Sequence, residues 1–493
     1  MITPFSIGVG VHNGHIGGWV AMCARTHLLT LLIGINLFFA GSATAQIQTG
    51  PVQSQSPPAE ERRLVGVGSC TAAGCHGGGR VDRVVGSEYN IWVNHDPHAR
   101  AYSMLFDERS QRMVQILNAS RSGALAAAHE DPRCLACHSM TDAKPLDPRR
   151  DVVSDGVGCE ACHGPAVDWL AVHFEQPFTP EERERSGFWN TDNLLVRTQT
   201  CVPCHVGGPD RDVTHDLIAA GHPRLQFEMG AYFEAMPKHW SDTKDREGRN
   251  ADFDAQLWAI GQACTSQAAL DQLARRAEPA GSPTVWPEFA EWSCSACHHD
   301  LRLDAPRQSP RSAEGAPGRF IEWDTWNHFV TRAHAPDVSR TFRLNTDSAS
   351  LIENALARLA VDMRQLNPDR RQVADLARGT ATELGRWAAA VEKSRLNPQQ
   401  IDPLMHSILA GELEKAVFDW DSAAQTYNAV ASLYETRARS APDNAELRAA
   451  IRKLYDDLAA KQRTPAGYIF RPDSIRRQLM EVRDQLPATE GDR

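Results

Sequence analysis

Ten of the twelve cysteines stand in five pairs, and a histidine directly follows each pair. Four of the pairs have two residues between the cysteines, and the first pair has four. The pairs with their histidines are Cys70, Cys75 and His76; Cys134, Cys137 and His138; Cys159, Cys162 and His163; Cys201, Cys204 and His205; and Cys294, Cys297 and His298. The C-x-x-C-H pattern is typical of c-type haem, where two thiols bond to the porphyrin and the histidine binds iron. The sequence therefore predicts five haem c groups.

Two other kinds of site also use paired cysteines. The pairs at 134–137 and 159–162 could form a four-cysteine zinc site, and a single pair could be a redox-active dithiol. Neither requires a histidine directly after the second cysteine. With 19 histidines in 493 residues, chance would place one after all five pairs with a probability of about 10⁻⁷. Haem attachment is therefore the favoured interpretation, and the wider first motif resembles a spacing found in some multihaem cytochromes.

Each haem iron also takes a second axial ligand or stays open on that side. Eleven histidines lie outside the motifs and the first 45 residues, and nine of them fall between His95 and His328. Because imidazole binds haem iron strongly, this supply favours a histidine on both faces of each iron. The best candidates for the distal ligands are His98, His173, His215, His222 and His239. The alternatives are His95, His129, His299 and His328, whereas His334 and His406 fit surface or core roles.

The sequence next to these candidates predicts how some of them are placed. His98 follows an Asp-Pro pair, which is typical of a helix start and puts His98 in the first turn. His173 lies ten residues after His163, too near to fold back over the same haem, so we expect it to bind a neighbouring one. His215 and His222 are seven residues apart, which two helical turns would span, so both could point the same way.

The composition and the amino-terminal segment indicate an exported, soluble protein. The formal net charge is −10, so the chain lacks the basic balance that nucleic-acid binding requires. The apolar run from Leu28 to Ala40 follows Arg25 and precedes an A-x-A site, the pattern of a secretory signal cleaved near Ala45. The run is short for a membrane span, and a retained anchor is the alternative. We expect a signal peptide over 1–45, no span in the mature chain and a periplasmic location.

The rest of the chain divides by composition into a haem region and a helical region. Residues 46–62 are polar and contain proline, as flexible tethers do. Residues 63–303 hold all five motifs, many short helical stretches and one long predicted helix over 252–276. Residues 304–345 are predicted to be a linker, and residues 346–490 carry several amphipathic helices without cysteine. We predict a mainly α protein, in which a multihaem cytochrome c domain with little regular sheet precedes a C-terminal α-helical bundle.

Three stretches of the haem region are distinctive. They are CHGP over 162–165, HDLIAAGHPRLQFE over 215–228 and WPEFAEWSCSACHHDL over 286–301. With the haem motifs, they resemble the periplasmic multihaem cytochromes c related to the tetrahaem cytochrome that accepts electrons from hydroxylamine oxidoreductase. The segment around His98 resembles the distal-ligand segment of that family. The resemblance covers residues 64–301 and implies closely stacked haems, mostly with two histidine ligands, that pass electrons; the tetrahaem relative has four haem sites where this chain has five.

These observations favour an electron carrier over a catalyst, and no catalytic residue is predicted. We expect five haems to form a wire between a donor and an acceptor protein in the periplasm. The alternative is an oxidoreductase that acts on a small nitrogen or sulfur oxyanion at one haem with an open coordination site. Pentahaem nitrite reductase opens an iron by using lysine in one motif, and no C-x-x-C-K occurs here. A third possibility is a scaffold whose helical bundle docks a partner that the haems supply.

Overall fold

The structure is a computed structural model of the 493-residue chain. The predicted signal peptide, the tether over 46–62, His299 and the linker residues 304–322 lie outside the residues that it describes. The described residues all belong to one unit of the chain. They are 63–78, 85–119, 127–141, 144–147, 151–175, 177–241, 252–278, 285–294, 297–298, 323–415, 419–439, 441–463 and 470–488.

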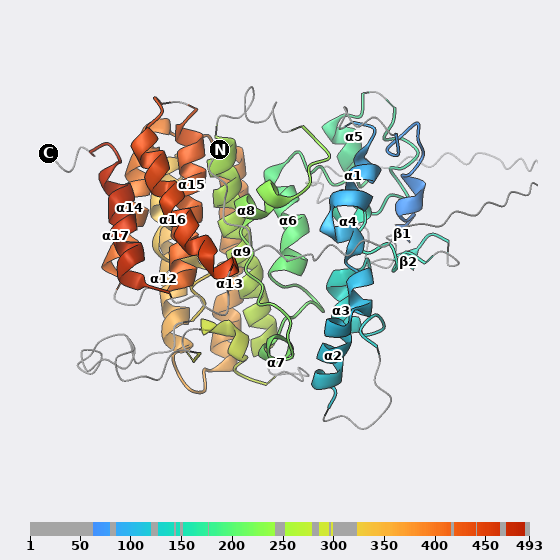
Figure 1. Cartoon of the computed structure of the whole chain (residues 1–493), viewed down its shortest axis with the longest axis horizontal. Coiled ribbons are helices and arrows are strands. Elements are labelled where there is room, and N and C mark those ends of the chain that lie inside the picture. Colours follow the sequence, from blue (N-terminus) through green and yellow to red (C-terminus); the bar gives the residue numbers. More distant parts are fainter. Residues whose placement is uncertain are drawn as a thin grey trace, which may run out of the picture. The chain divides into compact units, whose positions relative to one another are not determined.

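The described part of the chain is mainly α-helical, which confirms the predicted fold class (Figure 1). Its only paired strands are β1 (Arg63–Leu64) and β2 (Lys144–Pro145), which run parallel. In their register Arg63 lies opposite Lys144, and Leu64 lies opposite Pro145. This small sheet joins the start of the described chain to the segment after the second haem motif.

Short helices separated by loops make up the amino-terminal half. They are α1 (Glu88–His95), α2 (Glu108–Leu117), α3 (Pro132–His138), α4 (Glu160–His163), α5 (Pro180–Arg185), α6 (Leu194–His205), α7 (His215–Ala219) and α8 (Met229–Ala235). The 3₁₀ turn η2 (Val67–Ser69) precedes α1, and η3 (Pro97–Arg100) and η4 (Ser103–Phe106) lie between α1 and α2. Apolar clusters here are small, such as the one formed by Leu64, Met140 and Val152. Large flat cofactors could supply the missing apolar surface.

Longer helices form the second half and include the predicted C-terminal bundle. The helix predicted over 252–276 is confirmed as α9 (Phe253–Ala277). It is followed by the short turn η6 (Phe289–Glu291) and then by α10 (Phe329–Ala333), α11 (Ala335–Thr341), α12 (Thr346–Asp362), α13 (Arg370–Lys393), η10 (Pro398–Gln400), α14 (Ile401–Glu414), α15 (Trp420–Arg437), α16 (Ala445–Arg463) and α17 (Pro472–Asp484). Residues 323–345 of the predicted linker thus contain α10 and α11, and Trp326 and Phe342 are buried there. The predicted domain limits themselves stay a prediction.

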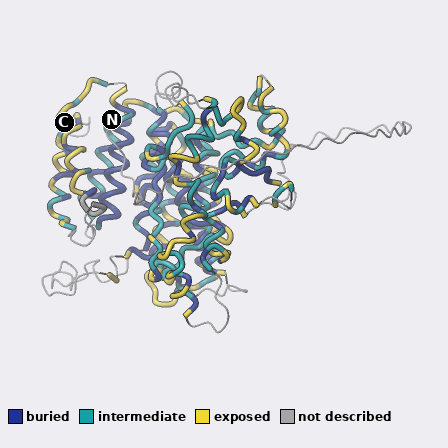
Figure 2. The backbone as a smooth tube through the Cα atoms, turned by 45° about the vertical axis from the view of Figure 1, so that its right-hand side comes forward, coloured by how far each residue is buried: buried dark blue, intermediate teal, exposed yellow. Residues whose placement is uncertain are grey.

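Helix α9 connects the haem region to the C-terminal helices. It packs against α6 and α8, which belong to the haem region, and against α13 and α15, which follow the predicted linker. Gly261 allows α8 to approach closely, because a Cβ there would lie 2.4 Å from the Cβ of Met229. One apolar cluster therefore extends from Leu194 to Leu486. The buried residues, dark blue in Figure 2, follow these long helices.

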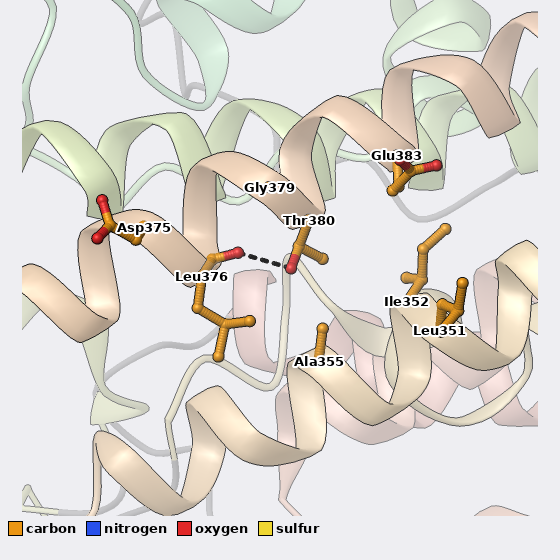
Figure 3. Close-up of a pocket in the computed structure, with 8 residues that line it drawn as sticks. All are labelled: Leu351, Ile352, Ala355, Asp375, Leu376, Gly379, Thr380 and Glu383. Atoms are coloured by element: carbon orange, nitrogen blue, oxygen red, sulfur yellow. Dashed lines mark hydrogen bonds between the residues drawn. The ribbon is translucent and has the colours of Figure 1, made fainter.

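A groove of about 330 Å³ lies between α12 and α13 (Figure 3). Its lining residues are Leu351, Ile352, Ala355, Asp375, Leu376, Gly379, Thr380 and Glu383. The hydroxyl of Thr380 donates a hydrogen bond to the Leu376 carbonyl within α13 (2.7 Å). With no histidine or cysteine in its lining, this groove is separate from the predicted haem sites. Among the described helices, none combines the length and the apolar character needed to cross a bilayer.

Candidate haem-binding sites

We number the motifs as sites 1 to 5 along the chain: 70–76, 134–138, 159–163, 201–205 and 294–298. The histidines of sites 2, 3 and 4 are the last residues of α3, α4 and α6. Residues at positions i, i+3 and i+4 share a helix face, so the two cysteines and the histidine of each motif point the same way. At site 5 the amides of Cys297 and His298 donate to the Cys294 carbonyl (3.2 and 2.8 Å), which forms the same kind of turn.

Side-chain caps fix where two of these motif helices begin. Asp131 caps α3 by accepting a hydrogen bond from the amide of Arg133 (2.9 Å). Asn193 caps α6 by accepting one from the amide of Val196 (3.0 Å). Such caps satisfy amides that the first helical turn leaves unpaired.

No disulfide occurs among the described residues. Nor do three or more His, Cys, Asp or Glu side chains gather in the described ranges as a metal centre would require. The pairs at sites 2 and 3 therefore do not converge as a four-cysteine zinc site does. Four of the five motif histidines instead each lie opposite one histidine from elsewhere in the chain.

Four motif histidines each face one of the predicted distal histidines. The ring centroids are 6.0 Å apart for His76 and His173, 6.0 Å for His205 and His98, 6.2 Å for His163 and His239, and 6.3 Å for His298 and His215. An iron–nitrogen bond of about 2 Å on each side and a ring radius of about 1.1 Å would put the centroids about 6 Å apart. Each pair is thus spaced to hold one iron between its two rings.

Five candidate ligands turn the Nδ1 atom of the ring toward an oxygen. The contacts are His76 to Glu88 Oε2 (3.0 Å), His98 to Asp96 Oδ1 (2.8 Å), and His138, His173 and His222 to the carbonyls of Ala101, Leu170 and Pro223 (2.8 Å each). A carbonyl only accepts, so the last three rings carry their proton on Nδ1 and leave Nε2 free. Metal-binding histidines usually have such an outer hydrogen bond. The residues present therefore fit haem iron.

Burial and neighbouring charges shift the pKa values of several of these histidines. Burial, followed by the charges of His239 and His76, lowers the pKa of His163 to about 4. Burial, followed by His98 and His138, likewise lowers the pKa of His205 to about 4. Both rings are therefore neutral near pH 7, the form that binds a metal. Burial opposes protonation of His98, but its contact with Asp96 outweighs burial and raises its pKa.

Site 2 differs from the other four sites. No ring in the described part of the chain lies against His138 at the spacing seen in the four pairs. His222 is near, because burial and the charge of His138 both lower its pKa, although its contact with the Pro223 carbonyl acts in the opposite direction. Arg109 of α2 donates to the carbonyl of Gly221 (2.6 Å) and joins this segment to the surroundings of site 2. His222 is therefore a distal candidate within electrostatic range of His138.

The expectation that His215 and His222 share one helix is corrected. Helix α7 ends at Ala219, and Gly221 has a φ of +122°, a conformation that glycine adopts at little cost. The chain therefore turns before His222. His215 faces His298 at site 5, whereas His222 lies near site 2. By contrast, the expected helical turn at His98 is confirmed, because Asp96 caps η3 and accepts from the His98 amide (3.0 Å).

The remaining histidines lie elsewhere. In the described part of the chain none of them faces a motif histidine. His95 is exposed at the end of α1, and His129 stacks on Phe106 with 4.2 Å between ring centroids. His328 is buried with Nδ1 2.8 Å from the Ser266 hydroxyl. His334 is buried, and Nε2 of His406 lies 2.9 Å from the Pro487 carbonyl.

Replacing Asp96 with alanine should loosen His98 at site 4. Removing the outer partner of a metal-binding histidine typically costs about 10–100-fold in metal affinity. We expect a high-spin signal from one haem in the absorption spectrum. Asp369→Ala is the matched control, because Asp369 also caps a helix, accepting from the Gln372 amide (2.8 Å) at the start of α13, but belongs to no haem motif. An unchanged spectrum in Asp96→Ala would remove Asp96 from the site.

One comparison with known proteins found a match. Residues 70–164 match the family model described as cytochrome c554 and c-prime. The match supports placing the chain among the multihaem c-type cytochromes. It spans sites 1, 2 and 3, and it implies haem c as cofactor and electron transfer with redox partners. No curated protein and no solved structure matches the chain.

Proposed function

We propose that this protein is a periplasmic electron carrier with five covalently bound haem c groups, each with two histidine ligands. The observation that carries the proposal is the set of four histidine pairs, whose centroids lie 6.0–6.3 Å apart. His138 with His222 would complete the fifth site. The ten motif cysteines would hold the porphyrins through thioether bonds.

The histidines would set the redox behaviour. A bound haem supplies a one-electron couple, and two imidazoles keep its potential low relative to a methionine-ligated haem. Glu88 and Asp96 would make the rings of His76 and His98 more basic through the Nδ1 contacts. The chain would thus tune sites 1 and 4 with a carboxylate and sites 2 and 3 without one.

Contacts between sites support a continuous path for electrons. The neighbouring Cys70, followed by burial, raises the pKa of the Cys159 thiol, so sites 1 and 3 are neighbours. The pKa of Cys162 is raised to about 12 by burial and then by Cys201, so sites 3 and 4 are neighbours. His205 at site 4 is close enough to His138 at site 2 for their charges to interact.

Site 5 would come last in this path. Arg211, six residues after His205 of site 4, donates to the Ala136 carbonyl within the site 2 motif (2.7 Å), which links sites 4 and 2. Arg224, two residues after His222, is near Cys294 of site 5, whose charge contributes to the raised pKa of Arg224. We therefore propose the order 1, 3, 4, 2, 5.

The alternative function is an oxidoreductase. One observation favours it, namely that no described ring pairs with His138 at the spacing of the other sites. If His222 did not bind, the iron at site 2 would be open to a small nitrogen or sulfur oxyanion. The electron-carrier proposal is stronger because His222 lies near His138 with its Nδ1 already bonded, as in three of the paired histidines, His76, His98 and His173.

The intact mass of the holoprotein tests the haem count. Protein exported with the haem-attachment machinery should weigh the mature polypeptide plus five haems. Cys70→Ser with Cys75→Ser should carry four, because site 1 loses both thioether bonds. Cys264→Ala is the control with five haems, since Cys264 is buried in α9 and belongs to no motif. Four haems on the unmodified protein would contradict the proposal.

A further inference from the structure

Arg276, near the end of α9, binds two carboxylates from different segments. Its Nη1 donates to Glu291 Oε1 (2.6 Å), and its Nε donates to Asp212 Oδ2 (3.2 Å). Its Nη2 also contacts Asp212 Oδ1, so the pair with Asp212 is bidentate. The side chain of Arg276 is 9% exposed and that of Glu291 is 6% exposed. This is a buried bridge rather than a surface ion pair.

Both carboxylates stand next to the candidate ligands of site 5. Asp212 lies three residues before His215, and Glu291 lies three residues before Cys294. A second link joins the same two segments, because Glu288 Oε1 accepts from the His215 amide (2.8 Å). Trp323 also holds the Glu291 side chain in place, because its Nε1 donates to Glu291 Oε2 (3.3 Å). The bridge therefore spans the two segments that must meet for His215 to face His298.

We propose that Arg276 is a positioning residue that holds the two ligand segments of site 5 at the spacing of one iron. The inference rests on the proposed function, since it takes His215 and His298 as the ligands. Guanidinium suits this role because it is planar, stays charged when buried and offers donors to two carboxylates at once. A lysine would keep the charge but lose the two-sided geometry.

Arg276→Met in the holoprotein should change site 5 alone. We expect one haem to become high-spin or to bind carbon monoxide, with four haems unchanged in spin state and potential. His215→Ala serves as the reference, because the signal it removes identifies site 5. Arg276→Lys should restore the low-spin signal in part. Asp212→Ala should give the same change more mildly, since Asp212 is 24% exposed and leaves Glu291 bound.

Arg275→Met is the matched control. Arg275 is the neighbour of Arg276 on α9, and its guanidinium hydrogen-bonds Gln272 of the same helix (3.2 and 2.7 Å). The Arg275→Met variant should leave all five haems unchanged. An unaltered site 5 in both Arg276→Met and Asp212→Ala, or equal changes at all haems, would overturn the inference. A haem that is not low-spin in the unmodified protein would instead contradict the proposed function.

Discussion

Ending the chain after Asn345 should abolish soluble, haem-loaded protein. The truncation removes α12 to α17, including α13 and α15, which pack on α9. Five large apolar side chains of α9 are at most 2% exposed: Leu257, Trp258, Ile260, Leu270 and Leu273. Burying each is worth about 1.5–3 kcal/mol, and even half of the sum approaches a typical net stability of about 5–15 kcal/mol. The measurement is the soluble yield and the haem-to-protein ratio after export.

A shorter truncation is the control for this experiment. Ending the chain after Phe470 removes α17, which packs on α14 and α16 rather than on α9. That protein should stay soluble with five haems. Recovery of five-haem protein from residues 1–345 would contradict the structural coupling and support the separable domains that the sequence predicts.

Removing site 3 should interrupt the proposed electron path. Cys159→Ala with Cys162→Ala prevents haem attachment between site 1 and site 4. Electron exchange between site 1 and the other sites should slow by orders of magnitude, because tunnelling weakens steeply with distance. In stopped-flow reduction, the haems should become reduced in two independent kinetic phases instead of one coupled phase.

The matched control removes a site at the end of the proposed order. Cys294→Ala with Cys297→Ala also costs one haem, but sites 1, 3, 4 and 2 stay adjacent. Their mutual exchange should keep its rate. If the site 3 variant reduced as fast as this control, the order 1, 3, 4, 2, 5 would be wrong.

Local signals predicted much of this protein from its sequence. Each haem motif can be recognised from a few neighbouring residues. In α9 and in α13 to α16 the apolar residues recur at helical spacing, and the structure has helices there. In α17, Ile475, Leu479 and Val482 are buried at the same helical period.

Long-range contacts could not be predicted in the same way. His173 faces His76 although the two lie far apart in the chain, and spacing alone cannot select such a pair. Glu88 looks like an ordinary acid at a helix start, yet it contacts His76. Arg276 likewise resembles an ordinary basic residue in the last turn of a helix, where its positive charge would interact favourably with the helix dipole. Only the folded chain brings these groups to the sites that they support.

The most direct test of the central claim is the spin state of each iron in the intact holoprotein. Electron paramagnetic resonance of the oxidised protein, quantified against the haem count from intact mass, gives the number of low-spin and high-spin haems. Carbon monoxide added to the reduced protein then reports any open iron. Two histidines on every iron predict five low-spin haems and no carbon monoxide complex. A high-spin haem that binds carbon monoxide in the unmodified protein would contradict the claim and favour the oxidoreductase.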